Sequence, residues 1–307
     1  MQRVTGFIMV SLLVMLGVPT YLSARQGVSV PPGWIKHSFS RFIYHVCIPT
    51  NRSTIVYAAT EAGSFRPSGV FVSNDSGKRF KAINRNLPER IVKGIAVMST
   101  KRNCVYVALS EKGVYRSCNQ GKTWGAKNKG LPVNIRATCL SLNPQAPRTL
   151  LLGLEGGELF RTVNGADSWT RLAPVSGDVS SIAFDPKNLH VYYVGMNGGR
   201  LYKSTDAGAT WNESQVGASS DPNNAISSIV IDPITPSSLY LSMTSAGIWK
   251  SFDSGATWSE KMNGLSNPKI NALVFDAKHP LTLYAGTAGS GVFALKTGAR
   301  VGFSYPL

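Results

Sequence analysis

An eight-residue pattern, approximately S/T-x-D/N-x-G-x-T/S-W/F, recurs five times in this sequence and constrains its fold more than any other feature. The third position of the five copies is occupied by Asp75, Asn119, Asn164, Asp206 and Asp253. Successive copies are 44, 45, 42 and 47 residues apart. A nearly constant period of this length predicts one supersecondary unit repeated along the chain, as in a solenoid or a propeller.

Each octapeptide has the composition of a tight β-hairpin turn. We expect the Asp or Asn at position three to accept hydrogen bonds from backbone amides two residues on. Gly at position five can adopt a positive φ at little cost, although the third copy has Ala166 there. The aromatic residue at position eight would open the next strand and fill the space between neighbouring units. These aromatic residues are Phe80, Trp124, Trp169, Trp211 and Trp258.

Short apolar segments between the octapeptides complete a four-stranded unit. The predicted first strands of the units lie near Phe42–Ile48, Ile95–Met98, Ala137–Leu142, Ser181–Phe184, Ser228–Ile231 and Asn271–Phe275. The last unit has three strands and no octapeptide after Leu295. We therefore predict an all-β, six-bladed propeller whose ring is closed by an N-terminal strand, Trp34–Ser38, which removes the free sheet edges.

The octapeptide resembles the Asp box, or bacterial neuraminidase repeat, of sialidases, xyloglucan-degrading hydrolases, sortilin-type receptors and photosystem II assembly propellers. The resemblance covers five copies at blade spacing and implies the propeller fold. It implies little about function, because in this superfamily the Asp box lies in an outer turn away from the ligand-binding face.

The first 24 residues differ in composition from the rest. Arg3 precedes an apolar run from Phe7 to Val18, and Ser23-Ala24 offers a small-residue cleavage point. This order is typical of a secretory signal peptide. An uncleaved membrane anchor is the alternative, because the apolar stretch approaches the length that spans a bilayer. Both interpretations predict that residues 25–307 form one exported domain, periplasmic or secreted.

The four cysteines show no metal-ligand spacing. Cys104 and Cys118 lie at the ends of neighbouring predicted strands. The sequence is compatible with a cross-strand disulfide between them and equally with two free buried thiols. Cys47 and Cys139 fall in first strands of units that are not adjacent, and we expect them in the core. The four histidines also lack ligand spacing, and the sequence predicts no metal or other cofactor.

Positive charge is concentrated in the first half of the chain. Residues 1–150 hold 21 Lys and Arg against 4 acids, residues 151–307 hold 11 against 12, and the net charge is +16. In a propeller, the loops from second to third strands share one face with the connections from a fourth strand to the next first strand. A cluster of cations there would steer an anionic partner. The cations that we expect on this face of the first three blades are Arg66, Arg85, Arg90, Lys93, Lys112, Lys127 and Lys129.

No catalytic set emerges from the sequence. A glycosidase needs two carboxylates roughly 5–10 Å apart, but most acids already belong to octapeptides or turns. Glu61, Glu111 and Glu155 are expected on one rim, which we interpret as ordinary turn polarity. Phe65-Arg66-Pro67 is only a faint echo of the Phe-Arg-Ile-Pro signature of sialidases, and we interpret it as chance.

The sequence therefore favours an exported, monomeric, non-enzymatic scaffold or assembly factor. Its partner would be an acidic protein surface, an anionic polysaccharide or lipid headgroups; nucleic acid would suit the charge but not the export signal. The alternative is a glycan-active protein, either a glycoside hydrolase of sialidase or xyloglucanase type or a lectin. The scaffold interpretation is similar to what is known of photosystem II assembly propellers, which are exported single propellers that bind a partner protein. Those propellers look seven-bladed, unlike this chain.

Overall fold

The computed structural model describes residues 43–47, 55–60, 68–75, 79–99, 103–217, 221, 224–260, 269–275, 282–287 and 292–296. At 43–47, 60, 286–287 and 292–296 it describes only the strand backbone. The predicted signal segment, the predicted closing strand Trp34–Ser38 and Arg66 lie outside these residues. No helix in the described part of the chain is long and apolar enough to cross a membrane.

The described strands form six antiparallel sheets, each built from strands consecutive in sequence. The first sheet contains β1 (Ile43–Cys47), β2 (Val56–Thr60), β3 (Gly69–Ser73) and β4 (Lys81–Ala82). The second contains β5 (Val92–Met98), β6 (Cys104–Leu109), β7 (Gly113–Ser117) and β8 (Gly125–Ala126). The third contains β9 (Ala137–Leu142), β10 (Leu150–Leu154), β11 (Leu159–Thr162) and β12 (Thr170–Arg171).

The second half of the chain repeats this arrangement. The fourth sheet contains β13 (Val179–Phe184), β14 (Tyr192–Met196), β15 (Arg200–Ser204) and β16 (Asn212–Gln215). The fifth contains β17 (Ile226–Ile231), β18 (Leu239–Met243), β19 (Gly247–Ser251) and β20 (Ser259–Glu260). The last contains three described strands, β21 (Ile270–Phe275), β22 (Thr282–Thr287) and β23 (Val292–Lys296). Two 3-10 turns, η1 (Glu155–Gly157) and η2 (Asn197–Gly199), complete the described elements, and the all-β prediction is confirmed.

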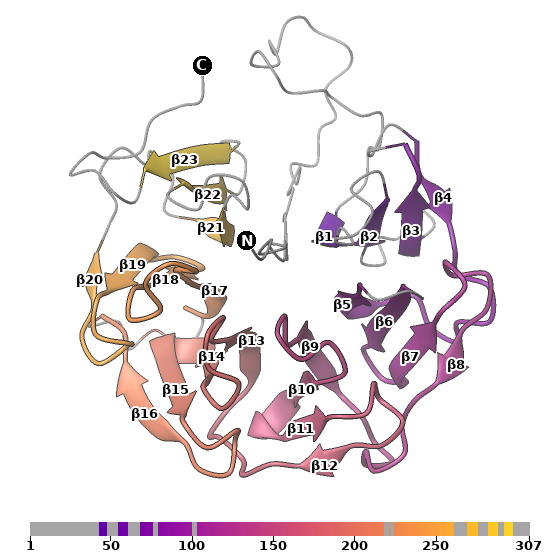
Figure 1. The fold of residues 1–307 in the computed structure, drawn as a ribbon, viewed down its shortest axis with the longest axis horizontal. Helices are drawn as coiled ribbons and strands as arrows, with labels where there is room; N and C mark the ends of the chain where they lie inside the picture. The colour runs from indigo at the N-terminus through magenta and orange to yellow at the C-terminus, as the bar shows by residue number, and fades with distance from the viewer. Residues whose placement is uncertain are drawn as a thin grey trace, which may run out of the picture.

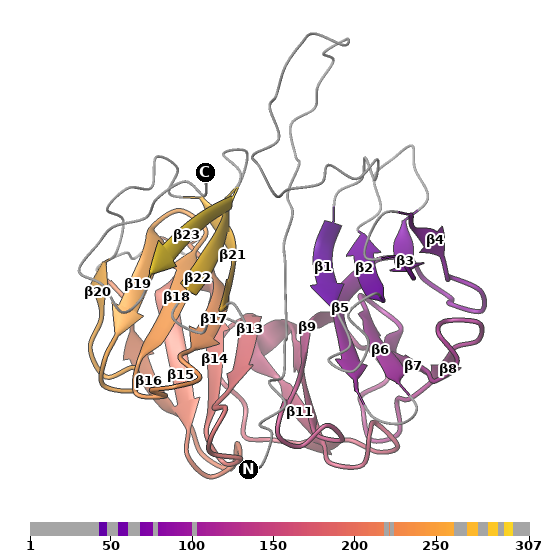
Figure 2. The same ribbon diagram turned by 45° about the horizontal axis from the view of Figure 1, so that its top comes forward.

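The six sheets are arranged around a common centre (Figure 1). The first strand of each sheet lies nearest the centre and the last described strand lies outermost, in both views (Figures 1 and 2). Neighbouring first strands contact one another in the order β1, β5, β9, β13, β17 and β21. The chain thus places each sheet face against the next, and the core lies between the sheets.

Every first strand is bulged against the second strand of its sheet. The extra residues are Tyr44, Lys93, Thr138, Ser180, Ser227 and Asn271. At two of them the hydroxyl group donates to the neighbouring sheet, from Ser180 to the Ile226 carbonyl at 2.9 Å and from Ser227 to the Ile270 carbonyl at 2.8 Å. The predictions that began first strands at Ile95, Ser181 and Ser228 were therefore too short, because a bulge interrupts strand alternation.

The four octapeptides that are described in full form closely similar turns between third and fourth strands. In the fourth copy the Ser204 hydroxyl donates to the Asp206 carboxylate at 2.8 Å and accepts from the Gly208 amide at 2.7 Å. The carboxylate accepts from the Thr210 amide at 2.9 Å, four residues on and not two as predicted. Gly208 has the predicted positive φ, 88°, and the residue before it, Ala207, also has a positive φ, 60°. The two residues with positive φ lie between Asp206 and Thr210, and the carboxylate bonds to the amide beyond them.

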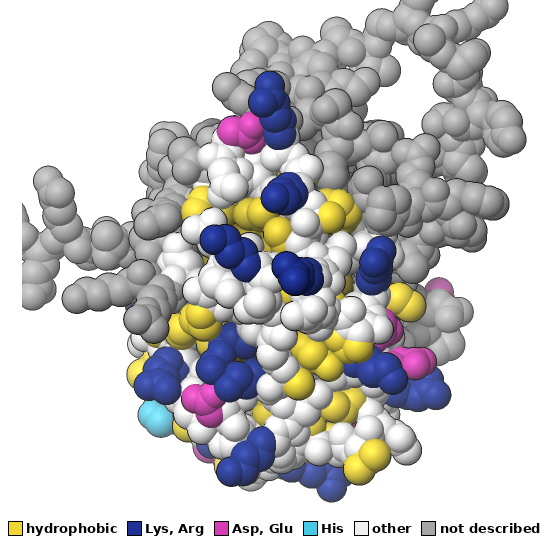
Figure 3. Space-filling view, turned by 90° about the vertical axis from the view of Figure 1, so that its right-hand side faces the viewer, with side chains coloured by type: hydrophobic (Ala, Val, Ile, Leu, Met, Phe, Trp, Pro, Cys, Tyr) yellow, Lys and Arg dark blue, Asp and Glu magenta, His cyan; other side chains and the backbone are white. Residues whose placement is uncertain are grey.

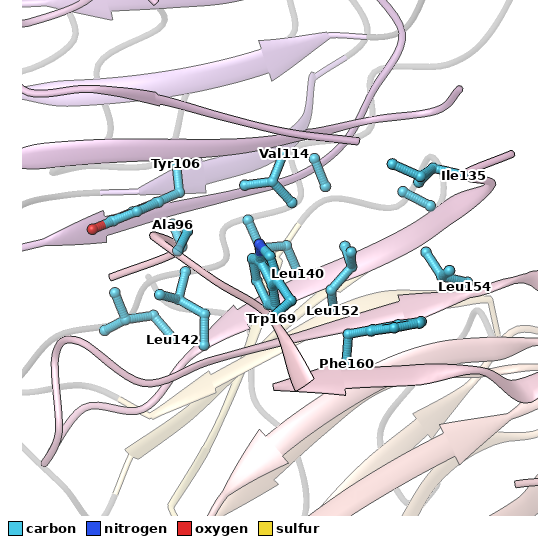
Figure 4. Close-up of a cluster of buried hydrophobic side chains, with 14 of the residues drawn as sticks. Ala96, Tyr106, Val114, Ile135, Leu140, Leu142, Leu152, Leu154, Phe160 and Trp169 are labelled. Atoms are coloured by element: carbon cyan, nitrogen blue, oxygen red, sulfur yellow. The ribbon is translucent and has the colours of Figure 1, made fainter. Parts of the chain in front are cut away.

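The aromatic residue that ends an octapeptide packs against the preceding sheet. Trp169 is buried between the second and third sheets, with Tyr106, Leu140 and Leu152 (Figure 4). Its indole N–H donates to the Lys127 carbonyl at 2.7 Å, and the indole of Trp124 donates in the same way to the Ile83 carbonyl at 2.6 Å. Trp124 and Trp169 therefore combine a large buried apolar surface with a satisfied polar group.

The cysteines divide into a disulfide and a buried thiol. Cys104 and Cys118 are joined by a disulfide, with their Cα atoms 4.0 Å apart. The bond links the start of β6 to the residue after β7. Cys139 lies buried in β9, and burial raises the pKa of its thiol to about 12. The side chain of Cys47 is outside the described residues.

Candidate partner-binding surface

Because consecutive strands of each sheet run in opposite directions, two kinds of connection lie at the same end of every sheet. The turns from second to third strands and the connections from a fourth strand to the next first strand share a face, which we call the loop face. The octapeptides and the turns from first to second strands lie at the opposite end. The predicted basic set belongs mainly to the loop face of the first three sheets.

Two asparagines hold the connections of the loop face in place. The Asn84 side chain accepts from the Val70 amide at 2.6 Å and donates to the Ser68 carbonyl at 3.1 Å. Asn128 repeats the arrangement one sheet later, with the Val114 amide at 2.8 Å and the Lys112 carbonyl at 2.9 Å. A cation follows each asparagine, namely Arg85 and Lys129, and both are exposed. The related segments 84–88 and 128–132, each Asn-x-x-Leu-Pro, are the sequence signal that we missed.

Hydrogen bonds between loops bring three of the predicted cations onto one surface. The Glu111 amide donates to the Glu89 carboxylate at 2.9 Å, which joins the loop of Arg90 to the turn of Lys112. Asn128 joins that turn to the segment of Lys129. Arg90, Lys112 and Lys129 are exposed, and none has an ion-pair partner among the described residues. We call these three residues and Arg85 the loop-face cations.

Lys127 requires a correction, because its ammonium group points toward the next octapeptide. It forms an ion pair with Asp167 at 2.7 Å, and Arg116 approaches the same carboxylate at 3.1 Å. Hydrogen bonding from Lys127, ahead of the opposing effect of burial, lowers the pKa of Asp167. The residue after β8 lies beside the third octapeptide, because the Trp169 indole donates to the Lys127 carbonyl at 2.7 Å. Lys127 therefore does not belong with the loop-face cations.

Two other predicted residues also stand apart. Lys93 is the bulge residue of β5, half-buried on the strand nearest the centre of the ring. Arg66 lies outside the described residues. Hydrogen bonds thus connect the segments of three of the seven predicted cations, and Arg85 lies in the same connection as Arg90.

An exposed apolar side chain accompanies the loop-face cations, and sequence reasoning overlooked it. Val133 is 99% exposed, in the connection that also carries Lys129. Leu131 in the same connection is half-buried against the core between the second and third sheets. The loop face therefore offers cations with an apolar contact beside them, a combination that suits a folded or extended protein partner better than a simple ion.

The printed contacts of the described loop-face acids are with cations and backbone amides, as for Glu89, which accepts from the Glu111 amide. Glu155 in η1 forms an ion pair with Arg136 at 3.6 Å, and the Gly156 amide beside it donates to the Asp178 carboxylate. Glu111 lies in the turn of the neighbouring sheet, and Glu61 is outside the described residues. No cluster of three or more potential metal ligands occurs within the described part of the chain.

Comparison with known proteins identifies the fold. No family model matches the sequence, and no curated protein matches it. Among solved structures, the GH74 enzyme of Niastella koreensis superposes with a TM-score of 0.67 at 16% identity, over 86% of this chain and 46% of that one. YCF48 from Cyanidioschyzon merolae superposes with a TM-score of 0.61 at 15% identity, over 80% of this chain and 78% of that one. YCF48 bound to D1 peptide superposes with a TM-score of 0.63 at 11% identity, over 88% of this chain and 82% of that one.

The lengths of these structures differ in a way that matters for function. This chain spans between 36% and 46% of three GH74 structures, but about four fifths of the two YCF48 structures. The fold is thus shared by enzymes and by a protein that binds a peptide, and at these identities the likeness assigns neither activity. The ring of antiparallel sheets and the structural neighbours together show that the chain has a fold of the β-propeller type.

Proposed function

We propose that this protein is an exported, non-enzymatic scaffold or assembly factor that captures an acidic protein partner through the loop-face cations. The observation that carries the proposal is the convergence of Arg90, Lys112 and Lys129 from three hydrogen-bonded segments. Exposed cations without ion-pair partners among the described residues retain their field for a ligand. A peptide-bound structural neighbour of nearly the same length is consistent with a protein partner.

The finer description of the fold belongs to the same proposal. We infer a single domain, residues 25–307, with six blades and octapeptides of the Asp-box type, preceded by a signal peptide or anchor. Six described sheets support this count, together with four fully described octapeptide turns and a first copy that shares the contacts of Asp75. The three described strands of the last sheet leave room for Trp34–Ser38 as the fourth. The protein would act as a monomer, without a cofactor, outside the cytoplasm.

The test is capture of the partner by the full chain in its native envelope. Arg85, Arg90, Lys112 and Lys129 are changed together to Glu, and both proteins are cross-linked, purified and analysed by mass spectrometry. We expect an acidic protein to be captured by the wild type at low salt and lost from the variant. A variant with reversed charges at Arg148, Arg171 and Lys187, exposed cations of the third and fourth sheets, is the control. Equal capture of the same protein by the four-residue variant and the wild type would refute the proposal.

A glycan-active protein is the second candidate, favoured by the likeness to GH74 enzymes and by Glu111 and Glu155 in equivalent turns of the loop face. It predicts hydrolysis of β-glucans or sialosides that is lost on Glu111→Gln or Glu155→Gln. A lectin would instead bind glycans saturably without cleaving them. Absence of both turnover and binding across a broad glycan panel would eliminate this candidate.

A further inference from the structure

A second basic surface lies on the outer edge of the ring, over the first two sheets. Its described cations are Arg79 at the end of the first octapeptide, Lys81 in β4 and Lys122 in the second octapeptide, and all three are exposed. Figure 3 views this side of the molecule and shows Lys and Arg side chains spread over it with few acids between them. None of these three residues is one of the loop-face cations.

Direct contacts place these three cations, the edge cations, on neighbouring segments. Arg79 and Lys81 are two residues apart, and Ile83 follows β4. The Trp124 indole donates to the Ile83 carbonyl at 2.6 Å. Gly121 lies so close to Ile83 that an added Cβ would meet its side chain at 2.4 Å. Lys122, between Gly121 and Trp124, is therefore carried directly beside the segment of Lys81.

The same positions carry different charges elsewhere around the ring. Position six of the octapeptide is Lys122 in the second copy but Asp167, Ala209 and Ala256 in the next three. The position of Lys81, which directly follows the octapeptide, is uncharged in the other sheets, where it holds Gly125, Thr170, Asn212 and Ser259. The basic character belongs to one side of the edge, so it is not a general property of the repeat.

The composition of this edge distinguishes its partner from that of the loop face. Protein interfaces are depleted in Lys and contain apolar or aromatic anchors. Between residues 79 and 126, the described part of the chain has no large exposed hydrophobic side chain, whereas the loop face has Val133. Asp75, the nearby acid, is engaged by the Ser73 hydroxyl at 2.7 Å and the Arg79 amide at 2.9 Å. A surface of exposed Lys and Arg side chains without apolar anchors suits diffuse adsorption to a charged plane.

We propose that the edge cations rest on an anionic lipid bilayer. The chain leads from the apolar segment Phe7–Val18 into the first sheet, so the sheet nearest in sequence to a signal or anchor segment is also the one with the basic edge. Attraction between Lys or Arg and anionic headgroups acts within a Debye length of the surface. Binding by this edge would leave the loop face, which opens at one end of the ring, accessible to a partner.

Sedimentation of the full chain with vesicles tests this surface independently of partner capture. Vesicles of equal parts phosphatidylglycerol and phosphatidylcholine are compared with vesicles of phosphatidylcholine alone. Reversal of the edge cations, Arg79→Glu, Lys81→Glu and Lys122→Glu, is expected to lower the partition coefficient on anionic vesicles roughly a hundredfold or more. Salt at about 0.5 M should abolish the difference between the two kinds of vesicle.

The matched control carries Arg85→Glu, Arg90→Glu and Lys129→Glu and has the same net charge. Its partition coefficient on anionic vesicles should fall by less than about tenfold. Unfolding curves establish that both variants fold. An equal loss in both variants would mean that overall charge governs binding, and equal binding of the wild type to neutral vesicles would mean that the apolar segment does. Stronger binding to soluble dextran sulfate than to vesicles would identify a polymer partner. Each of these three results would overturn the proposal.

Discussion

Asp206 and Asn119 occupy the same position in two octapeptides and differ in charge. The Asp206 carboxylate accepts from the Thr210 hydroxyl at 2.6 Å, the Thr210 amide at 2.9 Å and the Ser204 hydroxyl at 2.8 Å. These donors, led by the Thr210 hydroxyl, lower the pKa of Asp206 to about 2. Asn119 makes the corresponding contacts without a charge, with the Thr123 amide at 3.0 Å and the Thr123 hydroxyl at 2.8 Å.

The variant Asp206→Asn should make the protein less sensitive to acid. A folded pKa below the unfolded value of about 3.9 means that the carboxylate stabilises the fold above that pH. This contribution is lost as the pH falls toward the folded pKa. Urea unfolding at several pH values should therefore show a smaller decline in the free energy of unfolding between about pH 4 and pH 2 for Asp206→Asn than for the wild type. Glu260→Gln removes an exposed carboxylate outside the turns and is the control; identical slopes for the wild type and Asp206→Asn would contradict the prediction.

Neighbouring sheets are joined by cations that reach the octapeptide of the next sheet. Arg116 in β7 donates to the Gly165 carbonyl at 2.6 Å, Arg161 in β11 to the Ala207 carbonyl at 2.6 Å and Lys203 in β15 to the Ser254 carbonyl at 3.1 Å. In each case the acceptor is the fourth residue of the turn, whose positive φ directs the backbone toward the previous sheet. Together with the indole contacts, these bonds position one sheet against the next.

Truncation of one of these cations tests the role of the contact between sheets. Arg161→Met keeps most of the apolar stem but leaves the Ala207 carbonyl without its charged donor, so we expect a loss of about 2 kcal/mol in the free energy of unfolding. Arg171→Met is the control, because Arg171 is exposed and its ion pair with Glu158 is worth at most about 1 kcal/mol. Urea unfolding measures both, and equal losses would mean that the inter-sheet bond has no special importance.

The sequence predicted the elements better than the contacts between them. Local chemistry was enough for the octapeptide turns, and a period near 45 was enough for an all-β repeat. The residues before the turn, such as Phe160-Arg161-Thr162 and Tyr202-Lys203-Ser204, also repeat, but their acceptors lie 46 and 51 residues further on. Lys127 was misplaced for the same reason, because its ion-pair partner, Asp167, lies 40 residues further on in the octapeptide of the next sheet. Contacts of this kind have no local signal.

At the scale of the whole molecule, the last sheet differs from the other five in the described part of the chain. Five described sheets have four strands and the last has three, β21 to β23, with β23 outermost. An open edge is prone to pair with another chain. The proposed closure by Trp34–Ser38 would remove that edge and would couple the stability of the whole ring to a few residues far from the last sheet in sequence.

Substitution of Trp34 tests this closure. If Trp34 takes the place of the tryptophan that ends an octapeptide, Trp34→Ala should remove a large buried side chain and lower the free energy of unfolding by about 3–5 kcal/mol. Val133→Ala is the control, since Val133 is 99% exposed and its truncation should change stability little. An open sheet edge should also promote self-association, which sedimentation velocity would detect in the variant and not in the wild type. A Trp34→Ala protein that unfolds at the wild-type urea midpoint and remains monomeric would show that the ring is held by other residues.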